Sequence, residues 1–190
     1  KITGLRIMLY ERVNGFHALV VLGCIFGCFS VVLKNIPYGF FFNLLALILV
    51  TPTYLWGVKY VLKDKVATAI EATFYSFIVQ IFQVISAAFL VKAMMPDAGI
   101  HLYIDFIFLF IIGSIAAIIP ISIGGAGLRE ITFLYGLSFL SYNISIEAGI
   151  AFASVTFALS FMTSIIGLPL WYKLNSVKRI TKRRISIWSL

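Results

Sequence analysis

A glycine-rich stretch followed by two charged residues is the part of the sequence best suited to chemistry. It reads Pro-Ile-Ser-Ile-Gly-Gly-Ala-Gly-Leu-Arg-Glu over Pro120–Glu130. Successive glycine N–H groups form anion-binding nests, and a helix that starts near Leu128 adds the positive end of its dipole. Arg129 supplies a full charge and a fork of donors that suits phosphate, and Ser122 supplies a hydroxyl. The stretch therefore predicts a cradle for a lipid phosphate.

The same residues also fit a tight turn between two helices, with Arg129 as an anchor at the membrane surface, and the residues alone leave both interpretations open. Glu130 points about 100° away from Arg129 on a helix, so the two do not neutralise each other on one face. This favours a network with other segments, for which Glu11 and Arg12 are candidates; ordinary interfacial charge is the alternative for that pair. The candidate binding residues are Ser122, Gly124, Gly125, Gly127, Arg129, Glu130, Glu11 and Arg12.

The elements that position these residues are expected to be membrane helices. Hydrophobic residues make up 62% of the 190-residue chain and charged residues 12%, against about 45–50% and 25% in soluble domains. This composition excludes a soluble enzyme, a disulfide-rich secreted domain and a disordered tail. Crossing a bilayer takes about 20 apolar residues. The uncharged runs of that length are Val13–Leu33, Asn35–Val58, Ala72–Val91 and Ala148–Tyr172.

The segment between Asp105 and Glu147 differs, because its two apolar runs, Phe106–Ile119 and Ile131–Leu140, are short for a crossing. Proline ends the first run and glycines interrupt the chain before the second begins. Two short crossings or a re-entrant hairpin both satisfy this pattern. Asp105 is taken as part of the loop that precedes the first run. The sequence thus predicts an all-α polytopic transmembrane bundle of about six segments with a broken or re-entrant helix pair.

Basic residues set the expected orientation. The chain has 15 Lys and Arg against 7 Asp and Glu, and the basic residues concentrate in the N-terminal segment, in Lys59–Lys65 and in the tail 173–190. The positive-inside rule places these in the cytoplasm of a multi-pass cell-membrane protein. The tail is expected to attract anionic lipids, and nucleic-acid binding is not expected. No catalytic, metal or cofactor site is predicted, and His17 and His101 are assigned no role.

The motif at Pro120–Glu130 resembles that of the lysylphosphatidylglycerol synthase transmembrane-region family, the flippase-like membrane domain of multiple peptide resistance factors. The family pattern is Pro, a short stretch with Ser, Gly-Gly-x-Gly, a small apolar residue and Arg-Glu. Tyr10-Glu11-Arg12-Val13 also resembles the Glu-Arg pair of that family at the start of a membrane helix. The resemblance runs over essentially the whole chain.

The resemblance implies a lipid translocator that moves a lipid with a polar headgroup across the bilayer, with residues 1–172 as the flippase-like domain and 173–190 as the tail. Family members carry further helices before the Glu-Arg pair, so an N-terminally truncated member is expected. Synthase activity is not expected, because the aminoacyl-transferase domain of the synthases is absent. The expected partner is a lipid with an anionic or phosphate-containing headgroup. The alternative is an accessory subunit of a lipid-modifying system that acts with a membrane glycosyltransferase or lipid synthase; oligomerisation is left open.

Overall fold

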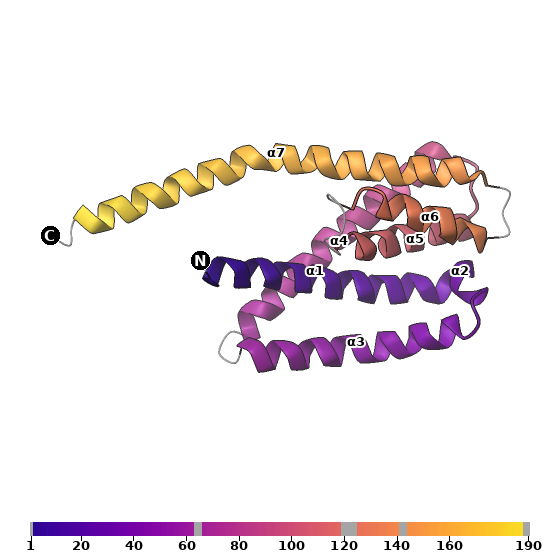
Figure 1. The fold of residues 1–190 in the computed structure, drawn as a ribbon, viewed down its shortest axis with the longest axis horizontal. Helices are drawn as coiled ribbons and strands as arrows, with labels where there is room; N and C mark the ends of the chain where they lie inside the picture. Colours follow the sequence, from indigo (N-terminus) through magenta and orange to yellow (C-terminus); the bar gives the residue numbers. More distant parts are fainter. Residues whose placement is uncertain (1, 63–65, 119–124, 141–143, 188–190) are drawn as a thin grey trace. The chain divides into compact units, whose positions relative to one another are not determined.

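The computed structural model describes residues 2–62, 66–118, 125–140 and 144–187, and within these it describes the side chains of 12–60, 70–118, 125–140, 144–167 and 169. The described residues form helices and short connections, without a strand among them. The helices are α1 (Ile2–Phe29), α2 (Val31–Lys34), α3 (Gly39–Leu62), α4 (Val66–Met94), α5 (Ile100–Ile118), α6 (Leu128–Ser138) and α7 (Ile146–Ile187). The predicted all-α class is confirmed (Figure 1).

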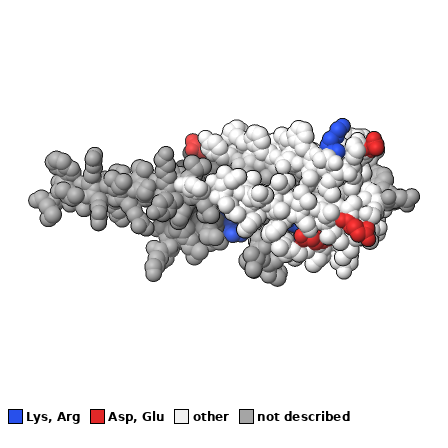
Figure 2. Space-filling model, turned by 90° about the horizontal axis from the view of Figure 1, so that it is seen from above, with Lys and Arg blue, Asp and Glu red and all other residues white. Residues whose placement is uncertain are grey.

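Long apolar helices dominate the chain. Five segments are long and apolar enough to cross a membrane: Arg12–Phe29, Gly39–Tyr60, Ile70–Met94, Ile100–Ile118 and Ile146–Gly167. Large apolar side chains are exposed along them, for instance Phe82 and Phe89 at 68% and 72%. On the face seen in Figure 2 the charged side chains of the described residues lie toward the edges and the middle is uncharged. A bilayer is the solvent that such a surface needs, so the chain is a multi-pass membrane protein.

The helix α6 is different, because its 11 residues extend only about 16 Å. That length falls well short of the roughly 30 Å of a bilayer core. The expected short helix after the glycine loop is therefore confirmed, and so is its start at Leu128. The helix before the loop is longer than predicted. It is α5, which begins at Ile100, six residues earlier than the predicted run, and includes Asp105.

Contacts cluster the chain into two compact units, residues 1–154 and 155–190. The first unit holds α1 to α6 and the first turns of α7. In it α1 packs against α3, α4 and α5, while α5 also packs against α6. The antiparallel pairs α1–α3 and α5–α6 are visible in Figure 1. The second unit is the remainder of α7, which continues through Pro169 to Ile187.

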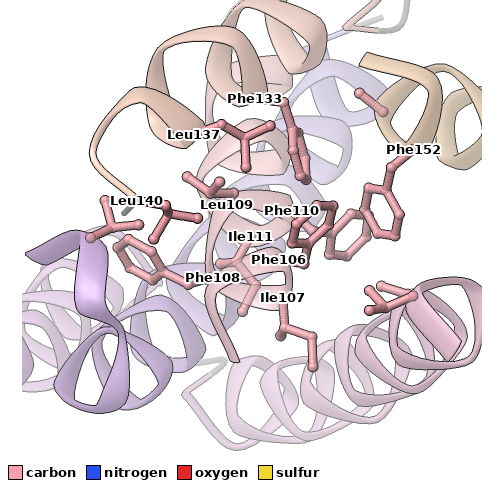
Figure 3. Close-up of a cluster of buried hydrophobic side chains, with 14 of the residues drawn as sticks. Phe106, Ile107, Phe108, Leu109, Phe110, Ile111, Phe133, Leu137, Leu140 and Phe152 are labelled. Atoms are coloured by element: carbon pink, nitrogen blue, oxygen red, sulfur yellow. The ribbon is translucent and has the colours of Figure 1, made fainter. Parts of the chain in front are cut away.

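Three phenylalanines hold α5, α6 and the start of α7 together. The ring centroids of Phe106, Phe133 and Phe152 lie 5.1 to 5.5 Å apart, and each side chain is at most 1% exposed (Figure 3). Tilted and edge-on aromatic pairs at this spacing add to the stabilisation that burial provides. Two glycines let the helices approach, because a Cβ on Gly136 or Gly149 would collide with a leucine of the neighbouring helix. This packing fixes α6 against α5, and it thereby positions the start of α6.

A buried hydrogen-bonded corner ends α1 earlier than expected. The predicted span Val13–Leu33 is interrupted at Ser30, whose extended backbone separates α1 from α2 and whose hydroxyl accepts the N–H of Val32 at 3.1 Å. Asp105 lies opposite this break. Its Oδ1 accepts the Ser30 hydroxyl at 2.6 Å and the Val31 N–H at 2.8 Å, and its side chain is 0% exposed. The expectation that Asp105 lies in a loop is wrong, because the free N-terminus of α2 provides donors that a buried carboxylate needs.

Candidate functional site

The start of α6 is formed by a glycine with a positive φ and a glutamate that caps the helix. Gly127, the residue before the helix, has φ +86°, which favours glycine. Its N–H donates to Oε2 of Glu130 at 2.8 Å. A glutamate at the third helical position commonly reaches back in this way to cap the helix. The N–H of Gly127, expected to face an anion, is therefore used by Glu130.

Gly125 is required by the fold itself. Its φ is +84°, and a Cβ placed on it would collide with the Cβ of Ala117 on α5. Both the backbone conformation and the close approach of α5 exclude a side chain. This glycine therefore supports the tight-turn interpretation of the motif.

Arg129, in the first turn of α6, packs against α5 and is partly buried. Gly113 of α5 approaches it so closely that a Cβ built on this glycine would lie 3.4 Å from the Cα of Arg129. The Cζ of Arg129 is 5.9 Å from the ring centroid of Phe110. Its Nε and Nη1 are buried and have no hydrogen-bond partner among the described residues. Removing a cation from water without a partner is costly, and the aromatic face offsets only part of this cost. An anion at this position would supply the missing acceptors.

The depth of Arg129 follows from the register of α5 along α1. A Cβ on Gly23 would lie 3.2 Å from Ile111 and 3.8 Å from Ile115, which places Gly113 level with Gly23. The apolar segment of α1 that is long enough to cross a membrane runs from Arg12 to Phe29. At 1.5 Å per residue, Gly23 lies about 9 Å from the Phe29 end and about 16 Å from the Arg12 end. Arg129, which lies against Gly113, is therefore level with the interior of this apolar segment.

Gly125, at the end of the turn, is also level with this apolar segment by the same register. Ala117, which Gly125 contacts, is level with residue 19 of α1, about 10 Å from Arg12 along the helix axis. The last described residue of α5, Ile118, is level with residue 18.

The other candidate residues are not all gathered at Arg129. Arg12 is exposed and is separated from the level of Arg129 by the same 16 Å or so along α1. Glu130 instead joins the start of α7, since its Oε1 accepts the Ser154 hydroxyl at 3.3 Å. Glu11 belongs to α1, but its side chain lies outside the described residues, as do Ser122 and Gly124 altogether.

A second polar cluster, which the sequence analysis missed, connects α1, α3 and α4. The Tyr54 hydroxyl donates to Oδ1 of Asn14 at 2.6 Å and lies 2.6 Å from Oγ1 of Thr73. His17 stacks on Tyr54 with centroids 4.0 Å apart, and its Nε2 lies 3.5 Å from Oγ1 of Thr51. The spacing of Asn14 and His17, three apart on one helix face, was the available signal.

No known protein family, curated protein or solved structure matches this chain. The resemblance to the lysylphosphatidylglycerol synthase transmembrane region therefore depends on the motif residues alone.

Proposed function

We propose that this protein is an integral membrane lipid translocator, which moves a phospholipid or another lipid with an anionic headgroup across the bilayer. Its helices expose apolar side chains over most of their length. A site among them is therefore reached most directly from the lipid phase. A ligand that enters from the lipid carries its own hydrocarbon and needs polar partners only for its headgroup.

The observation that carries this proposal is that two buried guanidinium nitrogens of Arg129 lack a partner among the described residues, at a level within the apolar segment of α1. Intramembrane charges are costly, and where they occur they face a pathway or a partner. The buried Nε and Nη1 of Arg129 have no acceptor in the described part of the chain. Phosphate oxygens match this planar fork of donors and also supply the opposite charge.

The short helix α6 adds a second argument. Transporters place interrupted helices near the membrane interior, because backbone freed from a helix is tolerated only against protein or a wet cavity. The register of α5 on α1 supports such a location for the turn between α5 and α6, and Gly125 and Gly127 give the turn its conformation. A headgroup that pairs with Arg129 would then sit at the end of the hairpin, beside the Glu130 cap.

The proposed orientation follows the basic residues. Lys and Arg are concentrated at the N-terminal segment, at the connection between α3 and α4 and in the tail. The positive-inside rule places all three in the cytoplasm. The Arg12 end of α1 is then cytoplasmic and the α1–α2 corner faces the opposite side.

A transport assay in proteoliposomes tests the function. A fluorescent phosphatidylglycerol is incorporated in both leaflets, and an impermeant reductant then reveals how much probe reaches the outer leaflet. Loss of a charge-assisted hydrogen bond contributes about 1.5–3 kcal/mol, so Arg129→Gln is expected to slow transport at least about 10-fold. Arg129→Lys keeps the charge but loses the fork, and it is expected to give an intermediate rate.

The matched control is Lys92→Gln, which removes one positive charge from an exposed side chain at the end of α4. It is expected to transport at the wild-type rate. Arg129→Gln protein that keeps its helical content and thermal stability, and yet transports like the control, contradicts the proposal.

A further inference from the structure

The buried corner between α1 and α2 leaves one oxygen of a carboxylate without a partner. Oδ1 of Asp105 accepts both donors of the corner, the Ser30 hydroxyl at 2.6 Å and the Val31 N–H at 2.8 Å. Its Oδ2 is buried and has no hydrogen-bond partner among the described residues. The side chain is 0% exposed, so bulk water does not complete the set.

The negative charge of Asp105 is also left without a balancing charge in this corner. Both donors at Oδ1 are neutral groups. The basic residue of α2, Lys34, is exposed at the last position of that helix. Because removing an ion from water is costly, a buried carboxylate needs a partner that compensates its charge. The free Oδ2 is where a positive charge would provide that compensation.

The break in the helix provides suitable surroundings for a cation. The helix α1 ends at Phe29, directly before Ser30, and the carbonyl groups in the last turn of a helix have no partner within that helix. Two of these carbonyls, on Phe26 and Gly27, share the N–H of Ser30 at 3.0 and 3.3 Å. Carbonyl oxygens keep a second lone pair, and the C-terminal end of a helix carries partial negative charge. Membrane transporters bind monovalent cations where an interrupted helix presents such carbonyls.

The chemistry of the available ligands favours Na⁺. They are oxygens, which suit a hard cation rather than a soft transition metal. A single carboxylate supplies one negative charge, and the described residues contain no group of three His, Cys, Asp or Glu side chains that could hold a metal ion, which disfavours a divalent one. A proton would not complete the site, because a protonated Oδ2 becomes a donor that needs an acceptor in turn.

We propose that Asp105 and the carbonyl end of α1 form a binding site for Na⁺, which joins α5 to the break between α1 and α2. Gly113, which packs against Arg129, lies eight positions after Asp105 on α5, about 12 Å along the helix axis. The cation site is therefore separate from Arg129 and does not rest on the proposed function.

Binding of radiolabelled Na⁺ to the purified full chain in detergent tests the site. Wild-type protein is expected to bind the label and to release it in excess unlabelled NaCl, but not in excess choline chloride, whose cation is far larger. Asp105→Asn keeps an oxygen that accepts both donors but loses the charge, and it is expected to weaken binding at least about 10-fold. The matched control, Asp97→Asn, makes the same change at an exposed acid in the connection before α5 and should bind like wild type.

A measurement on the wild-type protein alone covers the case in which Asp105→Asn does not fold. Replacing choline chloride by NaCl at constant ionic strength should raise the Tm, because a ligand that binds only the folded state stabilises it. The folded Asp105→Asn variant should lack this shift, and Asp97→Asn should keep it.

Three results would each overturn the proposal: no bound Na⁺ in wild type, equal binding by wild type and folded Asp105→Asn, or the same wild-type Tm in the two salts. A wild-type Tm that responds to pH in choline chloride and not to Na⁺ would make Asp105 a proton site, and it would overturn the proposal as well.

Discussion

The corner between α1 and α2 gives the sharpest stability prediction. Asp105→Ala removes the acceptor for two donors, the Ser30 hydroxyl and the Val31 N–H. Asp105 and Ser30 are both 0% exposed, so water does not replace the lost acceptor. Each buried donor left unsatisfied costs about 1–3 kcal/mol, and two of them predict a loss of about 2–6 kcal/mol in the free energy of unfolding.

Asp105→Asn refines the prediction, because its amide oxygen still accepts both bonds without the charge. Bonds to a charged acceptor contribute about 1.5–3 kcal/mol and neutral ones about 0.5–1.5, so the loss is expected to be near 2 kcal/mol. The assay is denaturant unfolding in detergent micelles, followed by circular dichroism. The control is Asp97→Ala, which changes an exposed acid in the connection before α5.

A double-mutant cycle with Ser30→Ala isolates the side-chain bond from the backbone bond. The free energies of unfolding of Asp105→Ala and of the control could instead agree within about 0.5 kcal/mol, the range of an ordinary surface substitution. In that case the corner does not stabilise the fold, and the assigned geometry is refuted.

Three other substitutions test the hairpin and its packing by the same unfolding measurement. Gly125→Ala is expected to lower the free energy of unfolding by at least about 1–2 kcal/mol because of the positive φ. Adding Ala117→Gly should restore the part of this loss that is due to the collision with Ala117. Equal losses with and without Ala117→Gly would contradict the contact. Glu130→Ala should lose about 1 kcal/mol with the helix cap while Glu130→Gln stays near wild type, unless the cap is not formed. Phe152→Ala should lose about 3–5 kcal/mol, whereas Leu159→Ala, at a position 44% exposed on the same helix, should lose much less; similar losses at the two positions would refute the aromatic cluster.

Hydropathy alone predicts most of the helices, because apolar runs between charges have the length that a bilayer requires. The runs Ala72–Val91 and Ala148–Tyr172 lie inside α4 and α7, whereas Asn35–Val58 begins four residues before α3. The start of α6 at Leu128 follows from the glycines before it. Asp105 shows the limit of this reasoning. A charge in a hydropathy pattern marks the end of a run, and only the tertiary contact with Ser30 reveals that this one is buried inside α5.

The candidate site was predictable in type but not in arrangement. Arg129 and the glycines stand out by residue type, whereas their depth depends on the register of α5 on α1, which involves residues about 90 positions apart. The capping of Gly127 by Glu130 was harder to detect, because glycine replaces the usual serine or threonine of the capping pattern. The sequence suggested Arg12 as a member of a network around Arg129 and Glu130, yet Arg12 lies near one end of the apolar segment of α1, well away from the level of Arg129.

The central claim is that Arg129 holds a lipid phosphate inside the membrane span. Solid-state NMR of the full chain in phosphatidylglycerol bilayers, with labelled arginine side chains, measures the proximity of arginine nitrogen to lipid phosphorus directly. Arginines near the membrane surface contribute to this signal, so the quantity of interest is the difference between wild type and Arg129→Gln. A short-range nitrogen–phosphorus contact that disappears in the folded variant is the predicted result, and identical signals from the two proteins would contradict the claim.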